Sequence, residues 1–83
     1  MKIRYTYKAA NDFRKLPREI QKRIAEKMRF YATQRDPLEF AKRLQDSRSG
    51  TFRYRIGDYR IIFDVTDEII FILKIKKRDS AYE

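Results

Sequence analysis

The stretch that decides the fold is residues 52–63, which read Phe-Arg-Tyr-Arg-Ile-Gly-Asp-Tyr-Arg-Ile-Ile-Phe. Apolar residues alternate with polar ones on both sides of Gly57-Asp58, which is typical of two antiparallel strands joined by a two-residue turn. Glycine at the first turn position favours a type II′ turn, because that position needs a positive φ. This turn predicts that Arg55 lies directly opposite Arg60.

The predicted hairpin has one apolar and one cationic face, because side chains alternate between the two faces of a strand. Like charges directly opposite in a sheet are destabilising. We therefore interpret the arginines as a binding site for an anion, with RNA phosphate as the first candidate, since the guanidinium fork donates two parallel hydrogen bonds. An ordinary solvated outer face is the alternative interpretation. The cationic face carries Arg53, Arg55 and Arg60, and the apolar face carries Phe52, Tyr54, Ile56, Tyr59, Ile61 and Phe63.

The overall charge also favours a polyanionic partner. The 83 residues include 21 Lys and Arg against 12 Asp and Glu, a net charge of +9. Nucleic acid is the first candidate. An anionic membrane surface is the second, but no predicted helix has the bulky apolar face that binding in a membrane interface favours.

The length and the missing residue types narrow the class of protein. We expect a single domain over residues 1–83 with one modest core. The chain has no Cys and no His, so disulfides, thiolate metal sites and the commonest general base are excluded. We therefore expect no metal and no other cofactor. We find neither a membrane-spanning run nor a signal peptide, and we expect the protein in the cytoplasm.

The N-terminal half predicts one strand and two helices. Residues 2–7 alternate as a half-buried strand with Ile3, Tyr5 and Tyr7 on one side. Residues 8–16 and 18–33 carry apolar side chains at helical spacing, and Pro17 separates the two helices. Residues 38–44 are predicted to form a short helical turn, and residues 45–50 a loop.

The C-terminal half predicts a three-stranded antiparallel meander. The hairpin occupies residues 51–65, a second tight turn lies at Thr66-Asp67, and the last strand covers residues 68–75. The fold class is therefore α+β: a two-layer sandwich in which an N-terminal strand and a helical hairpin pack on a four-stranded antiparallel sheet. In the last strand we expect Ile69, Phe71, Leu73 and Ile75 on the core face, and Ile70, Ile72, Lys74 and Lys76 on the other, with Ile62, Ile70 and Ile72 as a hydrophobic floor beside the cations.

Two further groups of residues could carry chemistry. Lys76, Lys77 and Arg78 leave the sheet beside the hairpin, and Tyr82 follows, a residue type that stacks on bases or transfers protons. A charged tail with one packing aromatic is the alternative interpretation. Three aspartates could suggest a metal, but we interpret Asp58 and Asp67 as turn residues and Asp64 as the partner of a neighbouring Lys or Arg.

Four segments together resemble the RelE/ParE superfamily of toxins from type II toxin–antitoxin systems: Leu16-Pro17, Lys42-Arg43-Leu44, the hairpin over residues 52–63, and residues 77–82. The likeness covers essentially the whole chain. It implies a RelE-like fold and, for the RelE branch of mRNA interferases, cleavage of mRNA in the ribosomal decoding site. There the RNA 2′-OH attacks the adjacent phosphate and the 5′-OH leaves, without a metal. The resemblance also implies a cognate antitoxin protein as partner.

The resemblance assigns roles position by position. Arg53 and Arg55 match the basic pair on the family's central strand, although RelE itself often has Lys there. A guanidinium is a poor general base, so phosphate clamping is the role we expect of them. Lys77 stands where many relatives have His. The expected catalytic residues are Arg53, Arg55 and Arg60 at the scissile phosphate, Arg78 at the leaving oxygen, and Tyr82 at a base or the 2′-OH, with Lys74, Lys76 and Lys77 binding RNA.

Two alternative functions stay open at the level of sequence. One is a ParE-like toxin that inhibits gyrase, a branch that shares the fold but lacks the full set of cations and tyrosine. The other is a basic RNA-binding module without catalytic activity. For the antitoxin we expect an acidic helix or extended arm, which binds either the arginine face or the helices near Ile24, Met28 and Tyr31.

Overall fold

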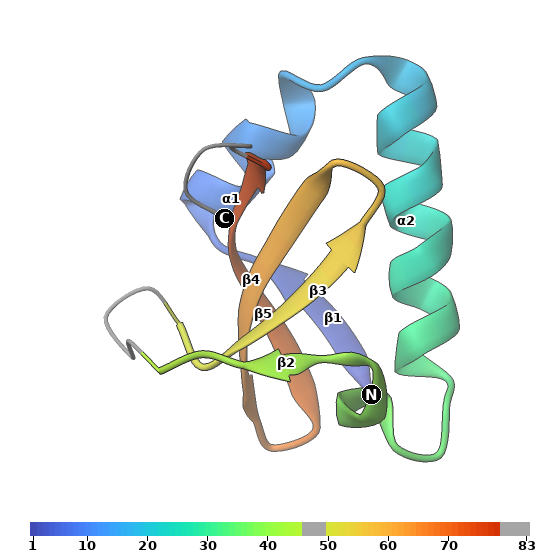
Figure 1. The fold of residues 1–83 in the computed structure, drawn as a ribbon, viewed down its shortest axis with the longest axis vertical. Coiled ribbons are helices and arrows are strands. Elements are labelled where there is room, and N and C mark those ends of the chain that lie inside the picture. The colour runs from blue at the N-terminus through green and yellow to red at the C-terminus, as the bar shows by residue number, and fades with distance from the viewer. Residues whose placement is uncertain (46–49, 79–83) are drawn as a thin grey trace.

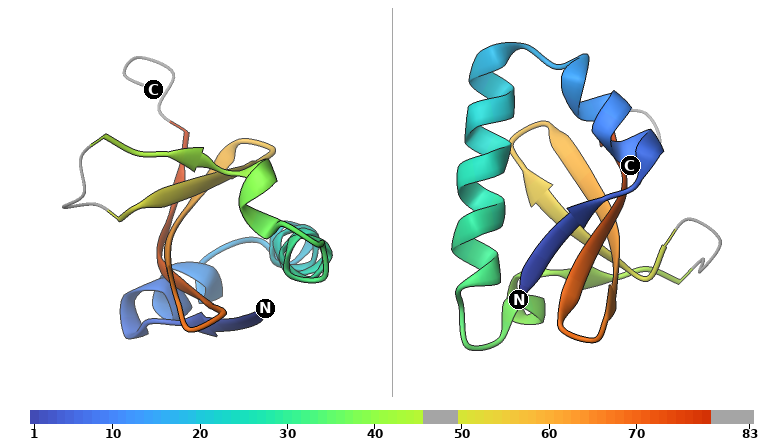
Figure 2. Two further views of the ribbon diagram at one scale, coloured as in Figure 1. Left: turned by 90° about the horizontal axis from the view of Figure 1, so that it is seen from below. Right: turned by 180° about the vertical axis from the view of Figure 1, so that it is seen from behind.

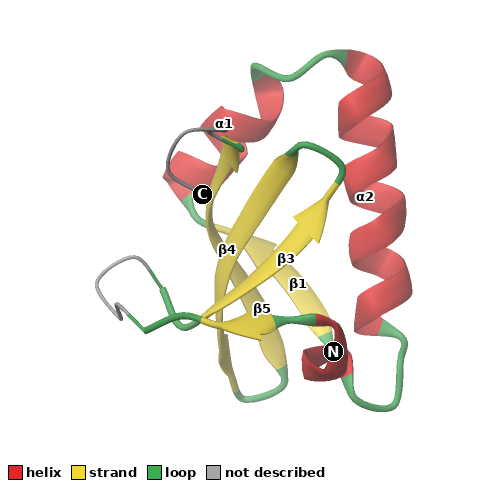
Figure 3. Ribbon diagram, in the orientation of Figure 1, coloured by secondary structure: helices red, strands yellow, loops and turns green. Residues whose placement is uncertain are grey.

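A computed structural model describes residues 1–45 and 50–78 of the chain, and these form an α+β fold (Figure 1). Both helices pack on one face of a twisted sheet, as Figure 3 shows, which confirms the predicted fold class. Within the described residues, neither helix is long and apolar enough to cross a membrane. The elements are β1 (Lys2–Tyr5), α1 (Tyr7–Arg14), α2 (Arg18–Ala32), the 3₁₀ helix η1 (Pro37–Phe40), β2 (Lys42–Arg43), β3 (Phe52–Ile56), β4 (Tyr59–Thr66) and β5 (Ile69–Lys77).

Over the described residues the sheet is mixed and has five strands in the order β1-β5-β4-β3-β2, so the prediction of four antiparallel strands is wrong in two respects. β1 runs parallel to β5, with Lys2 opposite Ile69. The two-residue strand β2 pairs antiparallel with β3, in a segment predicted as helical turn. Alternation reveals that a segment is a strand but not its direction, and two residues are too few to show a period.

The predicted hairpin register is confirmed. Arg55 lies opposite Arg60, and Phe52 opposite Phe63. Gly57 has a φ of 59°, the left-handed conformation expected of a type II′ turn. The second turn lies one residue later than predicted, at Asp67 and Glu68, whose φ values are 51° and 60°.

A β-bulge in β5 reverses the facing predicted for its first half. Ile62 pairs with Lys74 and Phe63 with Ile72, so Leu73 is the extra residue. Such a residue shifts the alternation by one position. The prediction that Ile69, Phe71 and Leu73 face the core is therefore wrong, whereas the placement of Ile75, Lys74 and Lys76 holds. The core residues contributed by β5 are Ile70, Ile72 and Ile75.

The first strand ends earlier than predicted, because Thr6 begins a helix. Its hydroxyl accepts a hydrogen bond from the Ala9 N–H at 3.1 Å, which is an N-cap. Tyr7 therefore lies in the first turn of α1 and is 94% exposed rather than half-buried in a strand. A threonine in an alternating stretch is compatible with a strand and with the start of a helix. The N-cap hydrogen bond of Thr6 shows that the helix starts here.

A stack of aromatic rings joins the helical layer to the sheet. The Tyr54 ring lies 4.1 Å from the Tyr31 ring and 4.4 Å from the Phe63 ring, centroid to centroid. The Tyr54 hydroxyl donates to the Pro37 carbonyl at 2.8 Å. This bond ties η1 to β3 within the core. The fully buried large side chains are Tyr54, Phe63, Ile24, Met28, Ile61, Ile70 and Ile72.

The environment of Tyr54 makes stability depend on alkaline pH. Burial raises the pKa of the Tyr54 hydroxyl, and Tyr31 and Asp36 raise it further. The unfolded chain loses this proton near pH 10, so stability is complete below pH 10 and falls above it. We predict that Tyr54→Phe lowers the free energy of unfolding by about 1–2 kcal/mol at pH 7, because the Pro37 carbonyl loses its donor, but makes the alkaline decline shallower.

Urea unfolding between pH 7 and pH 11 measures both effects. Tyr7→Phe is the control, since removal of the hydroxyl from this exposed side chain should leave the free energy of unfolding at pH 7 unchanged. An alkaline decline as steep in Tyr54→Phe as in the wild type would contradict the prediction.

Candidate nucleic-acid interface

The sheet face turned away from the helices carries two cross-strand rows of cations. One row is Arg55–Arg60–Lys76. The other is Arg53–Ile62–Lys74. Directly paired side chains on neighbouring strands lie about 4.5–5.5 Å apart at their Cβ atoms. The three predicted arginines thus share one face with two of the predicted lysines. We call Arg53, Arg55, Arg60, Lys74 and Lys76 the cationic face.

Exposure differs sharply among the three arginines. Arg55 is exposed and Arg53 half-buried, whereas Arg60 is 4% exposed. The Nε atoms of Arg53 and Arg60 are both buried. Arg55 is therefore open to solvent, whereas the Arg60 side chain is held within the face.

An apolar floor lies beside the cations, and it retains one of its three predicted members. Ile62 is 2% exposed and belongs to it. Ile70 and Ile72 do not, because the bulge turns them into the core. Gly50 lies directly on this floor: a Cβ there would be 2.5 Å from Cγ2 of Ile62 and 3.0 Å from Cδ1 of Leu73.

The cations that follow the cationic face lie at the end of the sheet. Lys77 is opposite Tyr59, which packs against the core, so the register places Lys77 on the helical side rather than with Lys74 and Lys76. Arg78 is exposed, and its backbone N–H donates to the Asp58 carbonyl at 2.6 Å, beside the β3–β4 turn. Tyr82 lies outside the described residues, and its role stays a prediction.

The three aspartates that could have suggested a metal lie in turns or accept a backbone hydrogen bond. Asp58 and Asp67 lie in the two tight turns, as predicted. Asp64 was expected to pair with a cation, but its carboxylate accepts a hydrogen bond from the Thr51 backbone N–H at 2.7 Å. This bond extends the β3–β4 pairing by one residue and explains why an acid stands beside so many cations.

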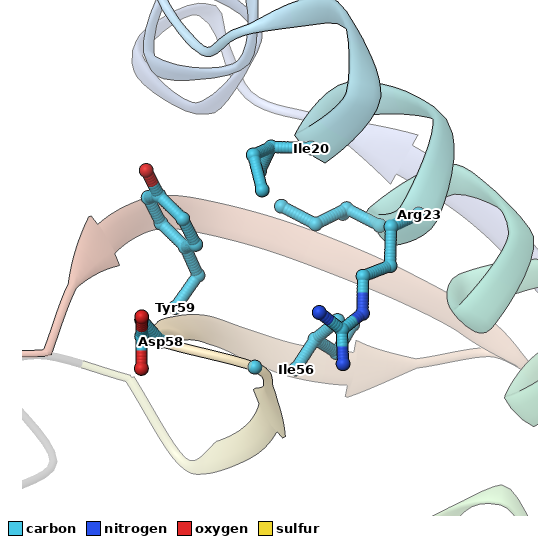
Figure 4. A pocket seen from close by; sticks show the side chains of 7 residues that line it. Ile20, Arg23, Ile56, Asp58 and Tyr59 are labelled. Atoms are coloured by element: carbon cyan, nitrogen blue, oxygen red, sulfur yellow. The ribbon is translucent and has the colours of Figure 1, made fainter.

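A small cavity of about 160 Å³ lies between α2 and the β3–β4 turn (Figure 4). Arg23 reaches from α2 over the turn, and its Nη1 is 3.1 Å from where a Cβ on Gly57 would stand. Sequence reasoning missed this contact, because Arg23 reads as one more solvated cation on a helix. It lies on the helical side and does not join the cationic face. The cavity is lined by Ile20, Arg23, Ile24, Ile56, Gly57, Asp58 and Tyr59.

The arrangement of helices and strands is shared with solved structures of a known class of proteins. The family model described as the ParE toxin of the type II toxin–antitoxin system parDE matches residues 3–82. The chain belongs to this family, within the RelE/ParE superfamily, and is a type II toxin of a toxin–antitoxin system. The resemblance seen in the sequence is thereby confirmed.

Individual relatives lie on the RelE side of the superfamily. Toxin RelG of Mycobacterium tuberculosis is 34% identical over 82 residues, which are 96% of this chain and 93% of RelG. The toxin–antitoxin complex RelBE2 of the same organism contains a chain with 34% identity and a TM-score of 0.76, with 93% of this chain and 96% of that chain covered. The archaeal RelE–RelB complex of Pyrococcus horikoshii OT3 gives 26% identity and a TM-score of 0.73, with 93% of each chain covered.

Proposed function

We propose that this toxin is a ribosome-dependent mRNA endoribonuclease. The observation that supports the proposal most directly is the cationic face, in which five cations stand in two cross-strand rows opposite the helices. The similarity to RelG and to RelE chains adds to it. Like-charged neighbours at this spacing are unfavourable for the sheet itself, and a bound phosphate backbone would offset that cost.

The proposed reaction needs positioning and charge neutralisation. The 2′-OH gives up its proton as its oxygen attacks the adjacent phosphorus, the P–O5′ bond breaks, and the leaving 5′ oxygen takes up a proton, which leaves a 2′,3′-cyclic phosphate and a free 5′-OH. Negative charge grows on the phosphate oxygens in the transition state. Preorganised donors aimed at that charge stabilise it. In the proposal Arg53 and Arg55 clamp the phosphate, and Arg60 adds its charge from beneath.

Other groups complete the proposed site. A guanidinium stays protonated, so the arginines act by charge and position. The proton lost by the 2′-OH and the proton gained by the 5′ oxygen are therefore transferred by groups other than these arginines. Arg78, beside the β3–β4 turn, stabilises the leaving oxygen, and Tyr82 orients a base or the 2′-OH. Lys74 and Lys76 hold the RNA backbone along the face, and Lys77 contacts it from the sheet end. The target, mRNA in the ribosomal decoding site, places the toxin in the cytoplasm.

The proposed partner is a cognate antitoxin with acidic segments. The solved relatives include toxin–antitoxin and RelE–RelB complexes, and a charge of +9 favours an acidic ligand. Ile24, Met28 and Tyr31 are buried in the core, so a partner that wraps the helices near them would contact exposed neighbouring side chains. Phe30 and Phe40 are exposed beside them, at 48% and 42%, and are available for apolar contacts.

Mapping RNA ends tests the proposed reaction. Purified toxin is mixed with ribosomes programmed with a defined mRNA, and new ends are located by primer extension and by their chemistry. We expect cuts that require the ribosome and carry 5′-OH and cyclic phosphate ends. Intact mRNA under these conditions would refute the proposal. Salt-dependent RNA binding without cuts would indicate a basic RNA-binding module instead.

The second candidate is a gyrase inhibitor. One observation favours it: the matching family model is described as a ParE toxin. In that case the toxin inhibits DNA supercoiling by purified gyrase and leaves ribosome-bound mRNA intact, so the two assays run side by side separate the candidates.

A further inference from the structure

The outer edge of β5 continues beyond the end of its neighbour β1. β1 pairs with β5 over Ile69–Ile72, and β5 runs on to Lys77. The segment that follows β1 hydrogen-bonds to part of this edge. The Thr6 N–H donates to the Ile72 carbonyl at 3.0 Å, and the Thr6 hydroxyl donates to the Leu73 carbonyl at 3.1 Å. The junction between β1 and α1 thus acts as a short substitute strand.

Asp12 on α1 extends the same edge by one more bond. Its Oδ2 accepts a hydrogen bond from the Ile75 N–H at 3.0 Å. The Asp12 side chain is 18% exposed, and Nζ of the exposed Lys8 lies 3.2 Å from its Oδ1. A hydrogen bond to an ionised acceptor is stronger than one between neutral groups. An amide left without an acceptor at a partly buried edge costs free energy, so Asp12 stabilises β5 here.

The position of this bond links it to the cationic face. Ile75 lies between Lys74 and Lys76 in the sequence. It follows two residues after Leu73, the bulged residue at which the ladder to β4 is interrupted. The views in Figure 2 show β5 between the β1–α1 segment and β4. The strand segment that carries both lysines is therefore bonded to β4 on one side and to the Asp12 carboxylate on the other.

We propose that Asp12 is a positioning residue, which holds the Lys74–Lys76 segment of β5 so that both lysines stay in their rows beside the arginines. The part of this proposal that concerns RNA rests on the proposed function. The hydrogen bond and its effect on β5 do not.

Amide hydrogen exchange measured by NMR on the full chain tests the structural half. Asp12→Ala should raise the exchange rate of the Ile75 amide at least about tenfold, and Asp12→Asn should restore most of the protection, because an amide oxygen accepts the same bond. Lys8→Ala keeps the carboxylate and should change the rate less than about threefold. Asp12→Ser, too short to reach the amide, replaces Asp12→Ala if that variant does not fold. Unchanged exchange in these variants, or Asp12→Asn exchanging as fast as Asp12→Ala, would overturn the proposal.

A double-mutant cycle tests the functional half. In the ribosome assay Asp12→Ala should raise KM about three- to tenfold with kcat nearly unchanged, and this effect should vanish when Lys74 and Lys76 are already alanine. The same effect in both backgrounds would overturn positioning through the lysines. If the wild type leaves mRNA intact, the proposed function fails, and the same cycle on binding of a short single-stranded RNA still decides whether Asp12 acts through the two lysines.

Discussion

Replacing Arg53 and Arg55 together by alanine should lower the rate of ribosome-dependent mRNA cleavage by a factor of about 100 or more. Removal of one preorganised donor to a developing oxyanion commonly costs about 10²–10³ in rate, and this variant removes two guanidinium groups. The measurement is the single-turnover cleavage rate on programmed ribosomes. A loss smaller than about threefold would mean that these arginines do not contact the scissile phosphate.

At Arg55 the loss should not arise from unfolding, and a urea denaturation curve of the double variant measures what the half-buried Arg53 contributes to stability. Arg55 is exposed and lies directly opposite Arg60, and like charges in that arrangement repel. Arg55→Ala removes one of the two like charges, so it should leave the free energy of unfolding unchanged or raise it by up to about 1 kcal/mol. A variant that is as stable as the wild type but inactive would show that these residues were retained for binding rather than for folding.

Two controls separate specific contacts from general charge. Arg18→Ala/Lys22→Ala removes the same charge from exposed positions of α2, on the helical side, and should change the rate less than about threefold. Arg53→Lys/Arg55→Lys keeps the charge but loses the planar fork. Intermediate activity of this variant would indicate that bidentate geometry matters.

The second large effect is expected at Gly50, where alanine should lower the free energy of unfolding by about 3 kcal/mol. Gly50 is buried and has a φ of 136°, a conformation that residues with a side chain rarely adopt. The added Cβ would stand 2.5 Å from Cγ2 of Ile62, well inside van der Waals contact. Overpacking costs about 1–3 kcal/mol and backbone strain about 1–3 kcal/mol. Urea denaturation measures the change.

Two further variants divide this cost between its causes. In an Ile62→Ala background the contact with Cγ2 of Ile62 is removed, while the backbone strain and the contact with Leu73 remain, so Gly50→Ala should cost less there than in the wild type. Gly57→Ala should cost only about 1–2 kcal/mol, because the added Cβ would meet the movable end of the Arg23 side chain. Equal costs at Gly50 in both backgrounds would show that the contact with Ile62 is not the cause.

The parts of the fold that could be predicted are those with a local physical cause. Gly57 requires one turn, that turn determines one register, and the register places Arg53, Arg55 and Arg60 on a common face. The facing of Lys74 and Lys76 followed from the same alternation, because both lie after the bulge.

The parts that failed depend on contacts between distant segments. The bulge at Leu73 turns Ile70 and Ile72 inward, and no residue near it marks the extra position. The parallel pairing of β1 depends on where α1 and α2 carry the chain. The bond from Ile75 to Asp12 joins residues 63 positions apart. Such a bond cannot be predicted from the alternation of apolar and polar residues. The burial of Arg60 is likewise determined by residues that are distant in the sequence.

The strand order has a kinetic consequence. β5, the last strand in sequence, lies between β1 and β4, so during synthesis the first strand has no neighbour until the final one emerges. Ordering a long intervening chain before such contacts form slows folding. In a nascent toxin the β3–β4 hairpin with its arginines is therefore synthesised first. Neither the sheet nor the cationic face is complete before β5, which carries Lys74 and Lys76, has been translated. The cationic face is therefore complete only once β5 has joined the strands on both of its sides.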